Sequence, residues 1–240
     1  MMKKRCAQLF ICALTVGIAT IAGITGIATI KGVETTETVE YAMEENEAFL
    51  TDSYPLNILP EPVILIKTND RVKNITECGS IGEVVRGLPK NSGLGYKRLY
   101  IKGYDGEVLA ITGKLVKKDE KNTSCCAWFY TKAHGEHVHY VGSLNTNNEN
   151  SPLRIKDGII NASNEYTYNT YIMTSDGKKF FEKDAMKINN EHSIKGFLSD
   201  KNDCNNRTYY NERSDGIESL ISDLNKKTKN SPFIDFEAAR

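Results

Sequence analysis

Short apolar runs separated by glycine, asparagine and aspartate fill the chain from about residue 61 to residue 188. They are rich in β-branched and aromatic residues, which is typical of strands. The clearest are VILIKT, YKRLYIKGYDGEVLAITGKLV, CCAWFYT, HVHYVGS and YTYNTYIMTSDGKKFFEKD. The Asp-Gly pairs in YDGE and SDGK lie between extended flanks and predict hairpin turns. The pattern predicts a mainly β domain over residues 61–230, with antiparallel strands arranged as a barrel or a sandwich.

The run CCAWFYT is bulky at almost every position. Successive side chains of a strand point to opposite faces, which divides the run into two sets. One set is Cys125, Ala127 and Phe129, and the other is Cys126, Trp128 and Tyr130. Because both sets are apolar, we expect a central strand whose two faces are both covered.

Near the end of the sequence, apolar residues recur three, four and seven positions apart, as on one face of a helix. They are Ile217, Leu220, Ile221 and Leu224. Asp215 and Glu218 can form a capping pair at the start of this helix, and lysines at 226, 227 and 229 suit the negative end of its dipole. We expect an amphipathic C-terminal helix over 215–228, laid on the β domain and followed by a tail over 231–240.

The N-terminal region has a different pattern, an apolar run without any charge from Leu9 to Ile30. As a helix these residues would span about 33 Å, which matches a bilayer core of about 30 Å. A cleavable signal peptide is the alternative, with a cleavage site at Gly26 to Ala28, but its apolar part is normally about 7–15 residues. The length favours an uncleaved transmembrane helix over residues 9–30, acting as a signal anchor.

The charges that flank this helix predict its orientation. Three basic residues stand at positions 3–5, whereas no Lys or Arg occurs from Gly32 to Ile66. By the positive-inside rule, residues 1–8 are a cytoplasmic tail and the bulk of the chain is extracytoplasmic. Glutamate-rich residues 31–60 would then form an acidic juxtamembrane stalk. Small residues spaced four apart within the anchor also suit a homo-oligomer.

Charge adds little to this prediction. The 240 residues include 31 basic and 31 acidic ones. Four of the basic residues flank the anchor, which leaves 27 basic against 31 acidic residues elsewhere. Because no long basic run or basic-aromatic stripe occurs, a nucleic-acid partner is not expected.

Four cysteines lie in the predicted outer part: Cys78, Cys125, Cys126 and Cys204. In a non-cytosolic domain they predict disulfide bonds. Adjacent cysteines rarely bond each other, because a trans peptide holds their Cα atoms about 3.8 Å apart and a bridge needs about 4.4–6.8 Å. Two pairings remain, in which Cys78 bonds either member of the doublet and Cys204 bonds the other. The alternative is that some of these cysteines are buried small apolar residues.

The outer part also carries four Asn-x-Ser/Thr sequons, which make it a candidate glycoprotein. The acceptors are Asn74, Asn122, Asn161 and Asn206. Because the chain is rich in asparagine, chance accounts for several such triplets.

The sequence HGEHVH offers a candidate metal site, because imidazole is a ligand for zinc, copper and nickel. On a strand His137 and His139 share a face, about 7 Å apart, while His134 has the opposite parity. Only a turn at Gly135 would unite all three around one zinc or copper ion. The alternative is a set of exposed histidines on a hairpin, with no cofactor.

Catalysis is the second alternative, with Cys125 or Cys126 as a nucleophile beside a histidine, and Cys126 with His137 or His139 as the favoured set. No family-type cysteine signature, Gly-x-Ser-x-Gly motif, phosphate loop or dinucleotide fingerprint accompanies them. An enzyme is therefore the less favoured interpretation. A protein-binding domain would instead expose an apolar or tyrosine-rich patch, and NEYTYNTY, residues 164–171, is the candidate.

Residues 103–187 resemble the GIDE or "beside a membrane" domain of membrane-anchored E3 ubiquitin-ligase relatives. The resemblance is carried by GEVLAITGKLV, SCCAWFYTK, GEHVHYV and YIMTSDGKKFFEKD, in that order. The chain lacks the family's Pro-Phe pair before the last apolar strand, its second membrane helix and its RING module, so ligase chemistry is not implied. YKRLYIKGYDGEVLAITGKLV is also similar to a bacterial SH3-like barrel. Both resemblances imply a small β module that binds a partner.

Together these patterns predict a single-pass membrane protein whose outer domain is a non-catalytic binding or assembly module. A viral envelope or cell-surface protein would have this layout, with a protein as partner.

Overall fold

The computed structural model describes residues 59–68, 71–132, 137–188, 194–200 and 205–240. All of them belong to one compact unit, Pro55–Arg240. The predicted cytoplasmic tail, anchor and nearly all of the stalk lie outside the described residues. Within the described residues, no helix is long and apolar enough to cross a membrane.

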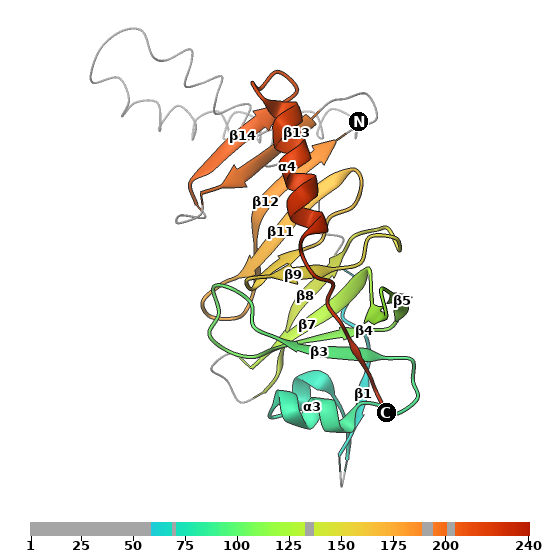
Figure 1. Ribbon diagram of the computed structural model, residues 1–240. Coiled ribbons are helices and arrows are strands. Elements are labelled where there is room, and N and C mark those ends of the chain that lie inside the picture. The colour runs from blue at the N-terminus through green and yellow to red at the C-terminus, as the bar shows by residue number, and fades with distance from the viewer. Residues whose placement is uncertain (1–58, 69–70, 133–136, 189–193, 201–204) are drawn as a thin grey trace, which may run out of the picture. The chain divides into compact units, whose positions relative to one another are not determined.

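Most of the described residues form antiparallel sheets, as the alternating patterns predict (Figure 1). A five-stranded sheet has the order β15-β3-β4-β7-β8. Its strands are β3 (Gly95–Leu99), β4 (Val108–Thr112), β7 (Cys126–Thr131), β8 (His139–Asn145) and β15 (Glu237–Ala238). A six-stranded sheet has the order β14-β13-β12-β11-β10-β9. Its strands are β9 (Arg154–Lys156), β10 (Ile159–Asn161), β11 (Thr167–Met173), β12 (Phe180–Ile188), β13 (Ile194–Ser199) and β14 (Arg207–Asn211).

Two small hairpins and two α-helices complete the described fold. The hairpins are β1 (Leu65–Lys67) with β2 (Val72–Asn74), and β5 (Val116–Lys118) with β6 (Lys121–Thr123). The helices are α3 (Ile81–Gly87) and α4 (Ile217–Lys229), and a 3-10 turn, η1, covers Ile75–Glu77. Asp-Gly stands in the connections β3–β4 and β11–β12, where hairpins are predicted.

The two large sheets are open, because each keeps two unpaired edge strands. The predicted barrel is therefore wrong for the described residues. The sheets instead share one apolar core, in which Phe129 of β7 meets Phe180 of β12 edge to face, with ring centroids 5.0 Å apart. Leu99, Val108, Leu144, Ile160, Tyr171 and Met173 extend this core.

Strand β7 is an interior strand with both faces covered, which confirms the prediction for CCAWFYT. Ala127 and Phe129 lie in the core between the sheets. Trp128 and Tyr130 face a second cluster, built on β1, α3 and the opposite side of β4. The alternation of strand side chains therefore divides this run between two cores.

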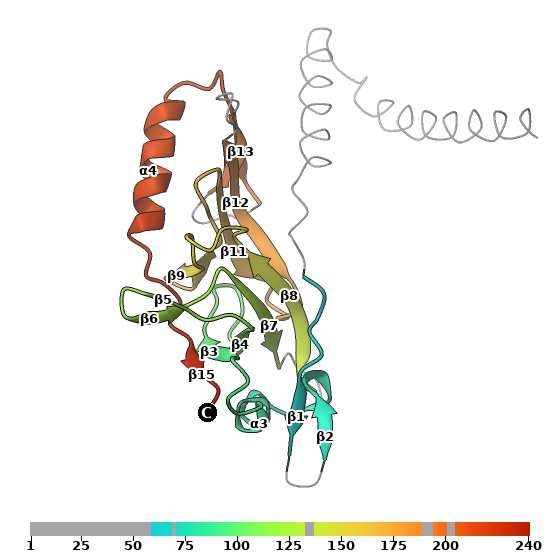
Figure 2. The same cartoon turned by 90° about the vertical axis from the view of Figure 1, so that its right-hand side faces the viewer.

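Helix α4 lies on one face of the six-stranded sheet, as the helical spacing predicts (Figure 2). Leu224 is buried against Met186 and Ile194, and Ile217, Leu220 and Ile221 pack around them. The predicted capping pair is wrong. The N-cap is Gly216, which has a left-handed φ of 71° and makes no side-chain cap.

Residues 231–240, predicted as a tail, are part of the fold. Phe236 is 1% exposed and belongs to the core between the sheets. Strand β15 then pairs with β3, matching Glu237 to Tyr96. The segment has no long apolar run, and its alternation of apolar and polar residues covers too few positions to predict a strand.

Candidate functional site

The face of the five-stranded sheet that carries Trp128 and Tyr130 also carries two side chains of the edge strand β8. In the strand register, Tyr130 is opposite Tyr140 and Trp128 is opposite Ser143. Tyr140 and Ser143 are three residues apart, so a regular strand would put them on opposite faces. A β-bulge between Phe129 and Tyr130 changes the register and turns both toward the same face.

Three of these side chains hold the backbone of a segment that precedes β1. Leu59 N–H donates to Ser143 Oγ at 2.6 Å, and the Tyr140 hydroxyl donates to Leu59 O at 3.0 Å. Trp128 Nε1 donates to Pro60 O at 3.1 Å. We call Trp128, Tyr140 and Ser143 the clamp, and Leu59–Pro62 the strap. The strap runs beside β8 toward β1 (Figure 2).

The clamp contacts main-chain atoms of the strap and forms no ladder of strand hydrogen bonds with it. Pro60 and Pro62 fix their φ angles near −65° and donate no N–H, which favours an extended conformation. A bulky aromatic surface with a few hydrogen-bond donors is a common way to bind such segments. The clamp therefore has the chemistry of a site for an extended, proline-containing peptide.

Tyr130 lies beneath this surface, fully buried, with its ring centroid 5.4 Å from that of Tyr140. Within the described residues its hydroxyl has no hydrogen-bond partner. Burial, together with the nearby carboxylate of Glu61, raises the pKa of Tyr130. Desolvation likewise raises the pKa of the exposed Glu61, and His139 partly opposes this shift.

The histidines predicted as metal ligands do not converge in the part of the chain that is described. His137 and His139 are exposed on either side of the buried Val138, and His134 lies outside the described residues. Among the described side chains, no group of three or more His, Cys, Asp or Glu could hold a metal ion. His139 instead acts electrostatically on Glu61 of the strap segment.

The catalytic alternative would require Cys126 and a histidine to meet, and the strand register separates Cys126 from His139. Cys126 is opposite Asn145, whereas His139 is opposite Thr131 at the other end of β7. Five residues of strand put Cys126 and His139 roughly 16 Å apart. This pair cannot exchange a proton.

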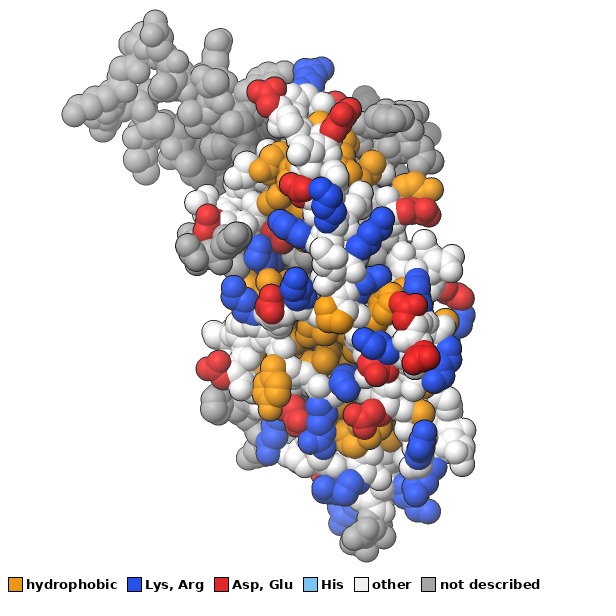
Figure 3. All heavy atoms as spheres, in the orientation of Figure 1, with side chains coloured by type: hydrophobic (Ala, Val, Ile, Leu, Met, Phe, Trp, Pro, Cys, Tyr) orange, Lys and Arg blue, Asp and Glu red, His pale blue; other side chains and the backbone are white. Residues whose placement is uncertain are grey.

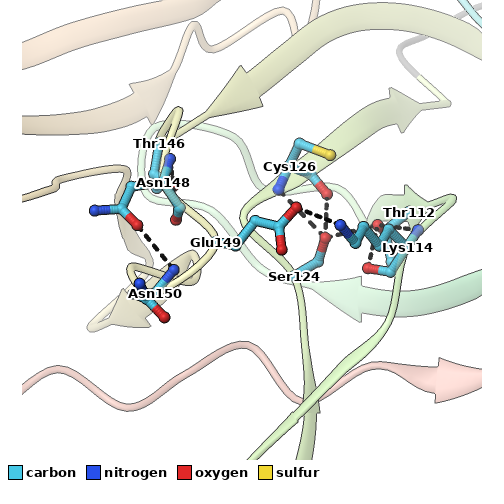
Figure 4. Close-up of polar contacts among 8 residues, drawn as sticks. All are labelled: Thr112, Lys114, Ser124, Cys126, Thr146, Asn148, Glu149 and Asn150. Atoms are coloured by element: carbon cyan, nitrogen blue, oxygen red, sulfur yellow. Dashed lines mark hydrogen bonds and ion pairs between the residues drawn. The ribbon is translucent and has the colours of Figure 1, made fainter.

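Cys126 lies beside a polar cluster at the start of β7 (Figure 4). Ser124 Oγ is 2.8 Å from Thr112 Oγ1 and donates to the Cys126 carbonyl, while Lys114 forms an ion pair with Glu149. The Cys126 sulfur points away from these contacts (Figure 4). Burial, followed by the adjacent Cys126 thiol, raises the pKa of Cys125.

Of the two predicted disulfide bonds, the one between Cys78 and a member of the doublet does not fit this fold, and the one between Cys204 and the doublet stays a prediction. No disulfide bond joins Cys78, Cys125 and Cys126 to one another in the part of the chain that the structure describes. The Cys78 carbonyl accepts from Val138 N–H, near the far end of β7 from the doublet. A separation on the order of 15 Å is well beyond the Cα spacing of a disulfide. Cys204 lies outside the described residues, so its bond to the doublet remains a prediction.

The acceptor asparagines of the four sequons differ in their exposure to solvent and in the hydrogen bonds of their side-chain amides. Asn74 and Asn206 are exposed. Asn122 is half-buried and donates through Nδ2 to the Phe236 carbonyl. Asn161 is 5% exposed and donates through Nδ2 to Thr228 Oγ1. A glycan on Asn161 would displace this contact between β10 and α4, so Asn161 does not suit the predicted modification in the folded domain.

The predicted tyrosine patch, NEYTYNTY, is largely inside the fold. Tyr166 is 48% exposed, but Tyr171 is buried in the core between the sheets and Tyr168 packs under α4. The segment therefore presents no continuous exposed tyrosine surface, because Tyr168 and Tyr171 are packed within the fold. The clamp residues Tyr140 and Ser143 and the strap were missed, although the prolines of LPEP and the single tryptophan are visible in the sequence.

Comparisons with known proteins give this chain no relative. No family model matches it, and neither a curated protein nor a solved structure does. The resemblance to the GIDE domain therefore stays a prediction.

Proposed function

We propose that the protein is a single-pass, membrane-anchored, non-catalytic binding module whose outer β domain holds an extended, proline-containing protein segment in the clamp. The observation that carries the proposal is the contact of Trp128, Tyr140 and Ser143 with the backbone of Leu59–Pro60. In this structure the protein's own strap fills the site. A partner segment of similar sequence would make the same contacts.

The surface chemistry supports a protein as the partner. On the face drawn in Figure 3, lysines and arginines lie among aspartates and glutamates, without a broad area of one sign. Nucleic-acid binding normally uses a continuous basic surface. The clamp offers aromatic rings and neutral donors, which suit a peptide backbone.

The membrane part of the proposal depends on the uncharged run at residues 9–30. Its length and the basic residues before it support an anchor with the β domain outside the cytoplasm. Extraction of membranes at high pH, followed by protease protection, tests both points. Release of the full chain into the soluble fraction, or protection of the N-terminus rather than the β domain in inverted vesicles, would refute the topology.

Peptide binding can be measured directly, because Trp128 is the only tryptophan of the chain. The test protein is the full chain in detergent micelles, with residues 59–62 replaced by Gly-Ser-Gly-Ser to empty the clamp. Titration with a peptide of residues 55–64, PLNILPEPVI, should change the Trp128 emission in a saturable manner. A scrambled peptide with the prolines moved should not do so.

The matched control keeps the tryptophan and removes three hydrogen bonds to Leu59, through Tyr140→Phe and Ser143→Ala. We expect this pair to weaken peptide binding about tenfold or more, because each neutral hydrogen bond contributes about 0.5–1.5 kcal/mol. An unchanged emission in the strap-substituted protein, with a native circular dichroism spectrum, would overturn the proposal.

A further inference from the structure

The strap is joined to the domain by a short segment that the described fold barely restrains. Between Pro60 and β1, residues 61–63 form no backbone or side-chain hydrogen bond with the described part of the chain. Glu61 and Val63 are exposed, and Val63 is 85% exposed. Rotation of the backbone in residues 61–63, which we call the hinge, would move Leu59 and Pro60, the strap residues that the clamp holds, away from the clamp and break their hydrogen bonds with it.

An exposed apolar surface continues from the hinge onto the first hairpin. Leu65 is opposite Asn74 and Lys67 is opposite Val72, so Leu65 and Val72 lie on the same face of the hairpin. Leu65 is 52% exposed and Val72 is 62% exposed. With Val63 they form a group of exposed large apolar side chains, which is a feature of surfaces that bind a partner.

We propose that the strap of one copy occupies the clamp of a second copy, so that the protein forms strap-exchanged dimers. This inference rests on the proposed function, since it names the partner segment of the same clamp. A second copy fits the clamp by construction, because its Leu59 and Pro60 carry the same backbone groups to Trp128, Tyr140 and Ser143. The two hinges would run close together, and their exposed Val63 and Leu65 side chains could then cover each other across a two-fold axis.

Exchange of identical segments between two copies requires no change in the clamp residues or in their hydrogen bonds. The closed chain and the exchanged dimer contain the same clamp contacts, so the balance between them depends on the hinge and on the local concentration of copies. Copies anchored in one membrane by residues 9–30 would meet at a raised effective concentration. Short hinges favour exchange, whereas longer ones favour the closed chain.

Cross-linking between two differently tagged full-length chains tests this inference. One chain carries benzoylphenylalanine in place of Glu61 and a first tag, and the other carries a second tag with no photo-reactive group. The two are co-expressed, extracted in detergent and irradiated. We expect a covalent product that contains both tags and joins position 61 of the first chain to the β7–β8 peptides of the second.

Two variants show whether the cross-link reports strap exchange. Trp128→Phe, Tyr140→Phe and Ser143→Ala together, placed in the second chain only, should abolish the mixed product. A Gly-Ser-Gly-Ser insertion between Pro62 and Val63 of the first chain should reduce the mixed product and increase the cross-link within that chain. A thermal melt of each variant verifies that its domain is folded.

The results separate this inference from the proposed function. If the two tags co-purify but every cross-link from position 61 stays within its own chain, the copies associate through another surface and strap exchange is wrong. The same conclusion follows if the hinge insertion leaves the mixed product unchanged. Peptide binding by the strap-substituted protein can succeed in either case, so a clamp that binds only its own strap would be recognised.

Discussion

The six-stranded sheet contains a buried ion pair whose removal should show strong coupling. Lys183 and Asp184 are each 8% exposed, and Lys183 Nζ lies 3.0 Å from Asp184 Oδ1. Asp184 also accepts from the Thr170 hydroxyl at 2.7 Å and from Ser199 N–H at 3.0 Å. A bulge between Thr170 and Tyr171 places consecutive residues of β12 inside the fold.

These contacts predict that Asp184→Leu lowers the free energy of unfolding more than Lys183→Met does. Asp184→Leu leaves the Lys183 ammonium with one long contact, to the Ser199 carbonyl at 3.5 Å. An uncompensated buried charge should destabilise the domain by about 3–5 kcal/mol. Lys183→Met leaves the Asp184 carboxylate with two donors, Thr170 Oγ1 and Ser199 N–H, so we expect a loss of about 1–3 kcal/mol.

The double variant, Lys183→Met with Asp184→Leu, buries no charge. Its loss should be smaller than the sum of the single losses by about 2–3 kcal/mol. Urea unfolding of the four proteins, followed by Trp128 emission and circular dichroism, gives each free energy of unfolding. Additivity within about 0.5 kcal/mol, or a greater loss for Lys183→Met than for Asp184→Leu, would refute the reasoning.

Three further predictions concern pH, packing and modification. Burial raises the pKa of the Glu182 carboxyl above its ordinary value. The protonated carboxyl therefore stabilises the folded domain fully below the unfolded-state pKa, and this stabilisation is lost as pH rises through the folded-state pKa. Glu182→Gln should remove this pH-dependent loss of stability in urea titrations at several pH values. Arg154 stacks on Phe233 at 3.9 Å and donates to the Ser231 carbonyl at 2.6 Å, so Arg154→Ala should lower the melting temperature and cost about 1–2 kcal/mol. In a glycosylating host, peptide mapping should find glycan at exposed sequons and none at Asn161, and full occupancy there would contradict its buried contact.

Predictions that depend on local strand and helix geometry succeeded. The alternation in CCAWFYT divides Phe129 from Trp128 and Tyr130, as observed, because opposite faces follow from the strand backbone alone. The spacing of Ile217 and Leu224 likewise predicts the face by which α4 packs. These patterns require no knowledge of which strands pair.

The clamp could not be predicted in this way, because it depends on pairing and on distant contacts. The bulge opposite Tyr130 decides that Tyr140 and Ser143 share a face, and no residue type in β8 signals it. The strap is 81 residues from Tyr140 and 84 from Ser143 along the chain. Spacing within HVHYVGS gives no information on such a contact. The same limit applies to Asn161, whose burial depends on Thr228 of α4.

The pairing of β15 with β3 has a consequence for how the protein is made. Tyr96 and Glu237 are 141 positions apart, so β3 has to wait with one edge unpaired while most of the domain is synthesised. Contacts this distant in sequence form slowly, and an exposed strand edge invites pairing with other chains. Phe236 also enters the core late, so a nascent chain that stops before it would lack both a core side chain and an edge strand. We expect chaperones to protect this edge during synthesis and the final fold to form after translation has passed residue 238.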